Sequence, residues 1–377
     1  MQEDMIETRQ EPIRAEKLPQ VDLFKGIAIF MIVLTHSAHP FSLPIWATWL
    51  PRFGQMGCQI FLVLSAFTLC LSYERKRPRY LSFVKTRFLR LALEYWCVLL
   101  LNTLIAGISI LATGENALGT DLNPKHILIN ALLLHGLVPA ANNSVIRVGW
   151  FVGTIFLFYL LFPLLFRLYR SRLFGNHRHI TFPLAFFVLG AGVMLFVGLV
   201  YPKQTIANNS FLYYSIVNQM PPLALGFSLF TLYRSEKTVK FPLWKGLVAL
   251  TVSVALFFGG IPYAFAFVPF AFALGFFYFF LLSLRSSCQG KLARAVGRCG
   301  IISFEIYLLH MYIVYDVQKA WNSLLFSGQS QGLLAYVVWL PIAFALSLGI
   351  GFLFHLLFFS AQKKLKHLFQ KKTPPQT

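Results

Sequence analysis

Apolar residues in this chain occur in long continuous runs separated by short polar or basic segments. Many of these runs approach the roughly 20 residues that an α-helix needs to cross a bilayer. Continuous rather than alternating apolar positions favour helices over the strands of a closed barrel. The pattern therefore predicts an all-α, polytopic membrane protein of about ten transmembrane helices, near residues 21–38, 57–73, 88–112, 148–166, 180–200, 211–233, 246–260, 262–284, 300–317 and 333–359.

The composition supports a membrane domain that occupies most of the chain. Hydrophobic residues make up 57% of the sequence and charged residues only 12%, about half the charged fraction of a typical soluble protein. We expect a polar cytoplasmic N-terminal tail over 1–20, one membrane domain over 21–360 and a basic cytoplasmic tail over 361–377. The polar N-terminal segment lacks the apolar core of a cleavable signal peptide.

The distribution of basic residues indicates the orientation of the helices. All but five of the 33 Lys and Arg residues fall on one side of the predicted spans, and the exceptions are Arg52, Lys125, Arg147, Lys203 and Lys319. Because cytoplasmic loops are enriched in Lys and Arg, both termini are predicted to be cytoplasmic, in a multi-pass protein of the inner or plasma membrane. The net charge of +20 is explained by this topology, so we expect no nucleic-acid partner and expect membrane lipids around the bundle.

Ionisable residues inside the first predicted span are candidates for function, because charge is costly in a bilayer. His36 follows Lys25 by 11 residues, which places both on one helix face, about 16 Å apart along the axis. Asp22 lies one turn before Lys25 on nearly the same face. Taken singly, Lys25 could be a snorkelling anchor and His36 a packing residue. Together they favour a polar cavity, with Lys25 near the cytoplasm and His36 in the outer half.

Other polar residues are weaker candidates. The span 300–317 contains Glu305 and His310, which lie about 140° apart around the helix and need not share a partner. Ser65 stands beside Ala66 and could mark close helix packing rather than chemistry. Trp150 could be only an interfacial belt residue.

A basic cluster precedes the third predicted span at its cytoplasmic end. Lys85, Arg87 and Arg90 could anchor the helix by the positive-inside rule or bind the phosphates of a nucleotide. On the opposite side, the long loop 113–147 contains an apolar segment, 126–137, that is too short to span and is read as an interfacial or re-entrant helix. The five cysteines show neither a disulfide framework nor metal-ligand spacing, so no metal is expected.

Several short motifs, taken in order, resemble the membrane acyltransferase-3 family. No single motif is specific for the family, but the order of the motifs, together with the predicted topology, is. They cover about residues 18–360. The family's basic residue, ten residues and His correspond to Lys25 and His36, and its second-helix motif to IFLVLSAF, with Ala66 in place of the usual Gly. The remaining matches are Arg87 and Arg90; Trp150, Phe158, Tyr159 and Pro163; and Ser303, Ile306, Tyr307 and His310.

The resemblance implies an integral membrane O-acyltransferase. Members transfer an acyl group from cytoplasmic acyl-CoA, most simply acetyl-CoA as co-substrate, to a hydroxyl of a cell-surface or exported glycan or a lipid-linked sugar. His36 would be the catalytic base, since a neutral imidazole suits proton abstraction at physiological pH, and Lys25 would assist near the donor. The other roles implied are CoA binding by Lys85, Arg87 and Arg90 and acceptor binding by Ser65, Trp150, Glu305 and His310.

Two positions depart from the family pattern. Many relatives carry Glu five residues after the Trp, where this chain has Ile155. The Arg that commonly precedes the proline of the sixth helix is also absent, and Asn218 and Gln219 occupy that region. A transporter or flippase of a glycan or lipid precursor, which also uses kinked helices and intramembrane charges, and a non-catalytic scaffold are the alternative functions.

Overall fold

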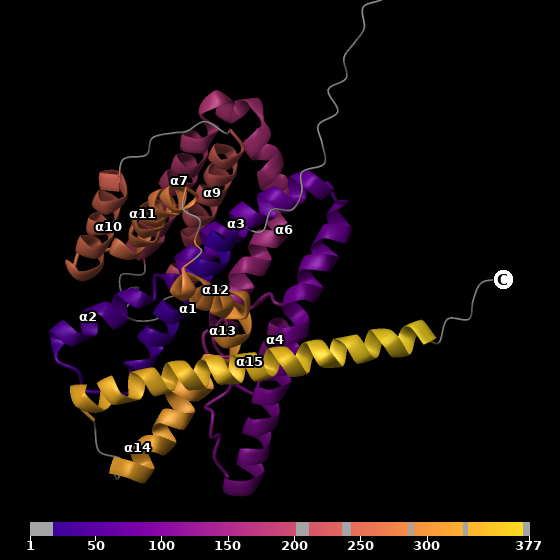
Figure 1. Cartoon of the computed structure of the whole chain (residues 1–377), viewed down its shortest axis with the longest axis vertical. Helices are drawn as coiled ribbons and strands as arrows, with labels where there is room; N and C mark the ends of the chain where they lie inside the picture. Colours follow the sequence, from indigo (N-terminus) through magenta and orange to yellow (C-terminus); the bar gives the residue numbers. More distant parts are fainter. Residues whose placement is uncertain are drawn as a thin grey trace, which may run out of the picture.

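The computed structural model describes residues 18–200, 211–235, 243–285, 288, 290–326 and 331–371. Throughout these ranges helices are the only regular secondary structure (Figure 1). Residues 1–17, which make up most of the predicted N-terminal tail, and residues 372–377 at the end of the predicted C-terminal tail lie outside the described residues. So do Lys203, Lys237 and Lys240.

Each predicted span coincides with helical structure. The principal elements are α1 (Pro19–Ser37), α2 (Ile45–Gly54), α3 (Gly57–Lys76), α4 (Tyr80–Thr113), α5 (Pro124–Ala131), α6 (Trp150–Arg170), α7 (Arg178–Val200), α8 (Phe211–Tyr214), α9 (Ile216–Arg234), α10 (Leu243–Phe258), α11 (Val268–Ser283), α12 (Lys291–Ile301), α13 (Ser303–Met311), the π-helix η6 (Tyr312–Val317), α14 (Gln318–Phe326) and α15 (Leu333–Lys371).

The lengths and hydropathies of these helices show a polytopic helical membrane protein. In the described part of the chain, seven helices are long and apolar enough to cross a bilayer. An eighth is obtained if α12 and the helices that follow it, bent by 68°, form one span. The shorter α10 is also apolar. The count of ten and the cytoplasmic termini stay predictions.

Helix α1 contacts α2, α3, α12, α13 and α15 and is therefore central to the bundle (Figure 1). Its approach to α12 is close enough to exclude side chains. A Cβ atom at Gly26 would overlap the Val296 carbonyl group, and one at Gly300 would overlap the Asp22 carbonyl group. Contact through small residues is a common way for helices to associate in lipid, where burial of apolar side chains gives little driving force.

A second close contact joins α3 to α9. A Cβ atom at Gly226 would lie 2.5 Å from Ala66 Cβ and 2.5 Å from the Val63 carbonyl oxygen. The segment containing Ser65 and Ala66 thus serves close packing, as one reading of the sequence suggested. Pro221 and Pro222 lie within the same helix α9.

The loop between α4 and α6 packs against the bundle. Its helix α5 is too short to span, and Asn130 at its end is fully buried. The Tyr95 hydroxyl on α4 donates to Asn130 Oδ1 at 2.6 Å. His126 on α5 hydrogen-bonds Asp121 in the preceding loop, and this bond holds the pKa of the Asp121 carboxyl below its usual value. The predicted non-spanning segment 126–137 is therefore helical only in part, and a hydrogen bond holds it against α4.

The α3–α9 contact can be tested with matched glycine substitutions. We expect Gly226→Ala to lower the free energy of unfolding by about 1–3 kcal/mol, since the added methyl group overpacks a full interface. Gly107→Ala on α4, where a Cβ atom would meet nothing within 4 Å, should be neutral or slightly stabilising. Thermal unfolding of both purified variants in detergent measures the difference. Equal midpoints would contradict the close contact.

Candidate functional site

A cavity of about 970 Å³ lies at the C-terminal end of α1. Its walls come from α1, α2, the segment before α6, α8, the connection between α10 and α11, and α13 with η6. Aromatic rings dominate the lining: Phe41, Trp150, Tyr213, Tyr214, Phe257, Tyr263, Phe265, Tyr307 and Tyr315. The polar lining includes His36, His39, Arg52, Gln55, Asn143 and Arg147, and no carboxylate lines this cavity. It can therefore accept a polar ligand with apolar faces, and its charge favours anions.

His36 lies on the cavity wall, with His310 behind it. Their ring centroids are 5.3 Å apart. His310 is fully buried, and its Nδ1 lies 2.7 Å from the Tyr307 carbonyl oxygen. Because a carbonyl oxygen only accepts, Nδ1 must carry the proton of a neutral ring, which leaves Nε2 as an acceptor. Nε2 is buried and has no hydrogen-bond partner in the part of the chain that the structure describes. The structure thus brings together the two histidines that the sequence singled out separately.

Trp150 is part of the same wall. Its ring stacks on Tyr214 with centroids 4.6 Å apart. Its main-chain N–H donates to Asn143 Oδ1 at 3.0 Å. Trp150 is 5% exposed and faces the cavity, so it is more than a belt residue.

The turn before Trp150 is held in a strained conformation. Val148 has φ of 58°, a left-handed backbone that β-branched residues rarely adopt. Side chains from two other segments bind this turn: Tyr307 donates its hydroxyl to the Val148 carbonyl, and His135 Nε2 lies 2.9 Å from the Gly149 carbonyl oxygen. Such strain persists only where surrounding contacts determine it. Tyr307 therefore links the late helix α13 to the cavity wall.

The amides Asn218 and Gln219, which stand where relatives commonly have an Arg, hold helix α8. Gln219 donates to the Tyr213 carbonyl at 2.6 Å, and Asn218 donates to the same carbonyl at 3.1 Å. Gln59 on α3 donates to Gln219 Oε1 at 2.9 Å. These buried neutral groups position Tyr213 and, next to it, Tyr214, which both line the cavity.

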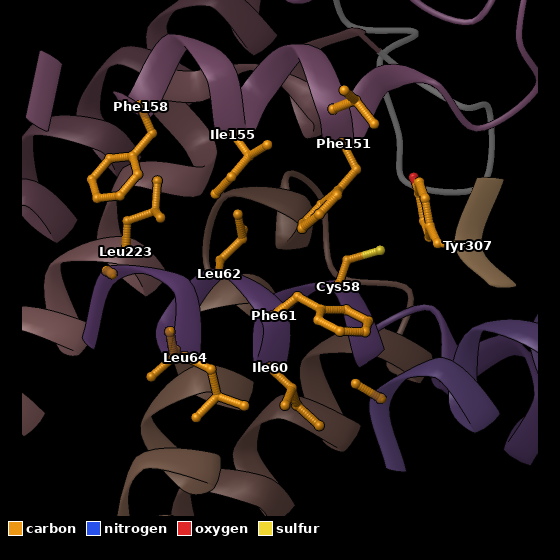
Figure 2. Close-up of a cluster of buried hydrophobic side chains, with 14 of the residues drawn as sticks. Cys58, Ile60, Phe61, Leu62, Leu64, Phe151, Ile155, Phe158, Leu223 and Tyr307 are labelled. Carbon is orange, nitrogen blue, oxygen red and sulfur yellow. The ribbon is translucent and has the colours of Figure 1, made fainter. Parts of the chain in front are cut away.

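Ile155, at the second position that departs from the family pattern, lies in an apolar core. Figure 2 shows its side chain directed from α6 toward α3, near Leu62 and Phe158. It is 3% exposed. A carboxylate here would meet hydrocarbon side chains, and this chain uses the position for packing between α3 and α6.

The cavity lining does not include Ser65, Lys25 or Glu305, nor His310 and the basic cluster at the start of α4. Ser65 is half-buried within α3 and is not part of the lining. Lys25 also lies outside it, and its ammonium group interacts electrostatically with Asp22 and Arg90. Glu305 is buried and pairs with His355 on α15, with 2.5 Å between Oε1 and Nδ1.

The basic cluster predicted to bind CoA lies at the start of α4. Lys85 and Arg90 are exposed. Arg87 is half-buried, donates to Ser72 Oγ at 3.0 Å, and lies over the rings of Phe83 and Tyr159. Lys85 and Arg90 are thus the members whose side chains remain accessible.

Several residues of the cavity wall were missed by sequence reasoning. Arg147 pairs with Asp316, since its Nη1 donates to both carboxylate oxygens at 3.0 and 2.9 Å, and its guanidinium lies over the Tyr315 ring. Arg147 was counted only as one of the outer basic residues. His135 does not line the cavity but binds the turn before Trp150, and a histidine inside the apolar segment 126–137 is a signal that the sequence offered.

Comparison with known families decides the class of the protein. A family model described as an acyltransferase domain matches residues 18–356. The chain belongs to the acyltransferase-3 family. The match runs from α1 into α15, and the resemblance seen in the motifs is confirmed. The protein is a multi-pass membrane acyltransferase, although no curated protein and no solved structure matches it.

A matched pair of tyrosines tests the strained turn. Tyr307→Phe removes the hydroxyl that donates to the Val148 carbonyl, so we expect a loss of about 0.5–1.5 kcal/mol in the free energy of unfolding. Tyr312→Phe removes a hydroxyl that has no partner among the described residues and should be neutral or stabilising. Thermal unfolding compares the two. If Tyr312→Phe cost as much as Tyr307→Phe, the hydroxyl bond to Val148 would have no role in stability.

Proposed function

We propose that this acyltransferase moves an acyl group, most simply acetyl, from cytoplasmic acyl-CoA to a hydroxyl of a cell-surface or exported glycan or lipid-linked sugar. The observation that carries the proposal is the position of His36, on the wall of a large aromatic cavity and backed by a second histidine. A general base must lie within hydrogen-bond reach of the proton that it abstracts. Of the ionisable residues that line this cavity, a neutral histidine is the one suited to act as that base.

The chemical step assigned to His36 is general base catalysis. Its unprotonated ring nitrogen takes the proton of the acceptor hydroxyl as that oxygen attacks the thioester carbonyl carbon. The carbon–sulfur bond of the tetrahedral intermediate then breaks. The proton passes from His36 to the CoA sulfur, so the products are an ester and free thiol and the imidazole returns to its neutral state. His310 packs beside His36 and limits its ring orientation.

The lining of the cavity suits a saccharide acceptor. Rings such as Trp150 and Tyr214 offer flat apolar faces, and Asn143 and Gln55 offer groups that can hydrogen-bond hydroxyls. The volume of about 970 Å³ lies at the upper end of common ligand pockets. These features support a glycan-sized acceptor.

The donor is assigned to the opposite end of α1. Lys85, Arg87 and Arg90 supply cations for CoA phosphates, and Lys25 lies near Arg90. The cavity reaches Ile32 but not Lys25, and Ile29 between them is fully buried. Donor access on this assignment therefore requires the packing beside α1 to open and admit the acyl arm.

The proposed orientation follows the basic residues. Counting the bent span that begins at α12, the buried α9 and the shorter α10 gives about ten transmembrane helices, in an inner or plasma membrane with both termini on the cytoplasmic side. His36 then lies in the outer half of the bilayer. Donor and acceptor would approach α1 from opposite sides.

Substitution of the proposed base should abolish acylation. We expect His36→Ala to lose glycan acylation by at least about 100-fold, the usual contribution of a positioned base, while expression and thermal unfolding stay as in the wild type. Mass spectrometry of surface polysaccharide from a deletion strain that carries each variant measures the acyl content. His177→Ala, in the basic segment between α6 and α7, is the control. Normal acylation by His36→Ala would overturn the assignment.

Labelled donor separates the enzyme from a transporter or flippase. Purified protein given acetyl-CoA with a labelled acetyl group should hydrolyse it slowly and transfer label when a glycan acceptor is added. A flippase would leave the thioester intact while moving the acceptor across vesicles. Release of labelled acetate or ester, measured against His36→Ala, is the readout. An intact thioester under all conditions would contradict the proposal.

A further inference from the structure

The mouth of the cavity is formed by residues that both line it and are exposed. These are His39, Arg52, Gly260, Ile261, Pro262 and Tyr315. They come from the segment after α1, from α2, from the connection between α10 and α11 and from η6. The other lining residues are buried or half-buried.

Helix α2 presents different faces to the cavity and to the surroundings. Its cavity side carries Thr48, Pro51 and Arg52. Its outer side exposes Ile45, Trp46, Trp49 and Leu50 to between 52% and 77%. Exposed tryptophans on a short amphipathic helix are typical of the interface between acyl chains and headgroups. The mouth of the cavity is therefore flanked by a surface that suits lipid.

Arg52 lies where these two surfaces meet. Its guanidinium is 5.8 Å from the centroid of the Phe258 ring, and Trp49 stacks on the same ring. Of the two arginines that line the cavity, Arg147 is neutralised by Asp316. No carboxylate lies within ion-pair distance of Arg52 in the described residues. Arg52 is thus an available cation at the mouth of a cavity that no carboxylate lines.

We infer that Arg52 binds the phosphate of a lipid-linked saccharide, so that the acceptor reaches the cavity from within the membrane. The hydrocarbon chain would lie along the apolar side of α2, and the saccharide would extend inward toward His36. A guanidinium binds phosphate through parallel hydrogen bonds. This inference rests on the proposed function, because it selects a lipid-linked sugar from the acceptors named there.

A free soluble glycan explains these features less well. It carries no hydrocarbon chain that could bind the apolar surface beside the mouth, and a neutral glycan carries no anionic group that could pair with the accessible arginine. The ligand chemistry that matches both is an anionic amphiphile. Free inorganic phosphate shares only the charge, so it serves as the competing ligand in the test.

Binding of a polyprenyl phosphate to the purified full-length protein tests the inference without any acyl transfer. Native mass spectrometry in detergent would compare polyprenyl phosphate, uncharged polyprenol and inorganic phosphate. We expect retention of polyprenyl phosphate alone, weakened about tenfold or more by Arg52→Gln, which is the scale of one lost charged hydrogen bond. Arg52→Lys should keep most of the binding, which separates loss of charge from misfolding.

Lys125→Gln is the matched control, because Lys125 is also an exposed cation of a predicted outer segment but does not line the cavity. It should bind as the wild type does. Equal binding by the wild type and Arg52→Gln, no binding of polyprenyl phosphate, or equal retention of inorganic phosphate would each overturn the inference. Since the readout is binding, an inactive His36 would leave the result unchanged and would count only against the proposed function.

Discussion

The contact between the backbones of α1 and α12 is the interaction on which the arrangement around the cavity depends. Glycines at Gly26 and Gly300 let the two helices approach until main-chain atoms touch. This contact fixes α1 at the end that carries Lys25. A helix is rigid over three turns, so the same contact also determines where His36 lies. Within the bilayer, apolar side chains gain little free energy by moving from lipid to protein. Close packing of this kind therefore replaces the hydrophobic effect that stabilises the cores of soluble proteins.

Much of this fold could be predicted because the thickness of the bilayer sets the length of the helices that cross it. Continuous apolar runs located the helices, and the joint order of short motifs indicated the family. The angular separation of Glu305 and His310 around one helix also agrees with their separate neighbours, His355 and His36. What periodicity could not show is which residue meets which across the bundle. The Arg147–Asp316 pair and the bond from Tyr307 to Val148 join segments more than 150 positions apart, and no local pattern records them.

The two departures from the family pattern have different physical solutions. At Asn218 and Gln219, neutral amides satisfy main-chain groups of α8 and avoid the cost of burying a charge. They still shape the site, since Tyr213 and Tyr214 depend on them. At Ile155 the polar group is lost altogether and the space is filled with hydrocarbon. The first change preserves a polar role with different chemistry, and the second converts the position to packing.

The packing around Ile155 has a consequence for proton movement. Protons cross a protein along chains of water or titratable side chains, and Ile155 is surrounded at the α3–α6 interface by apolar side chains such as Leu62 and Phe158 (Figure 2). On the proposed mechanism, a proton taken up by His36 would find no titratable side chain in this part of the interface. It would leave with the thiol or through the mouth beside Arg52. The apolar packing around Ile155 would then insulate the proposed chemistry electrically from the opposite side of the bilayer.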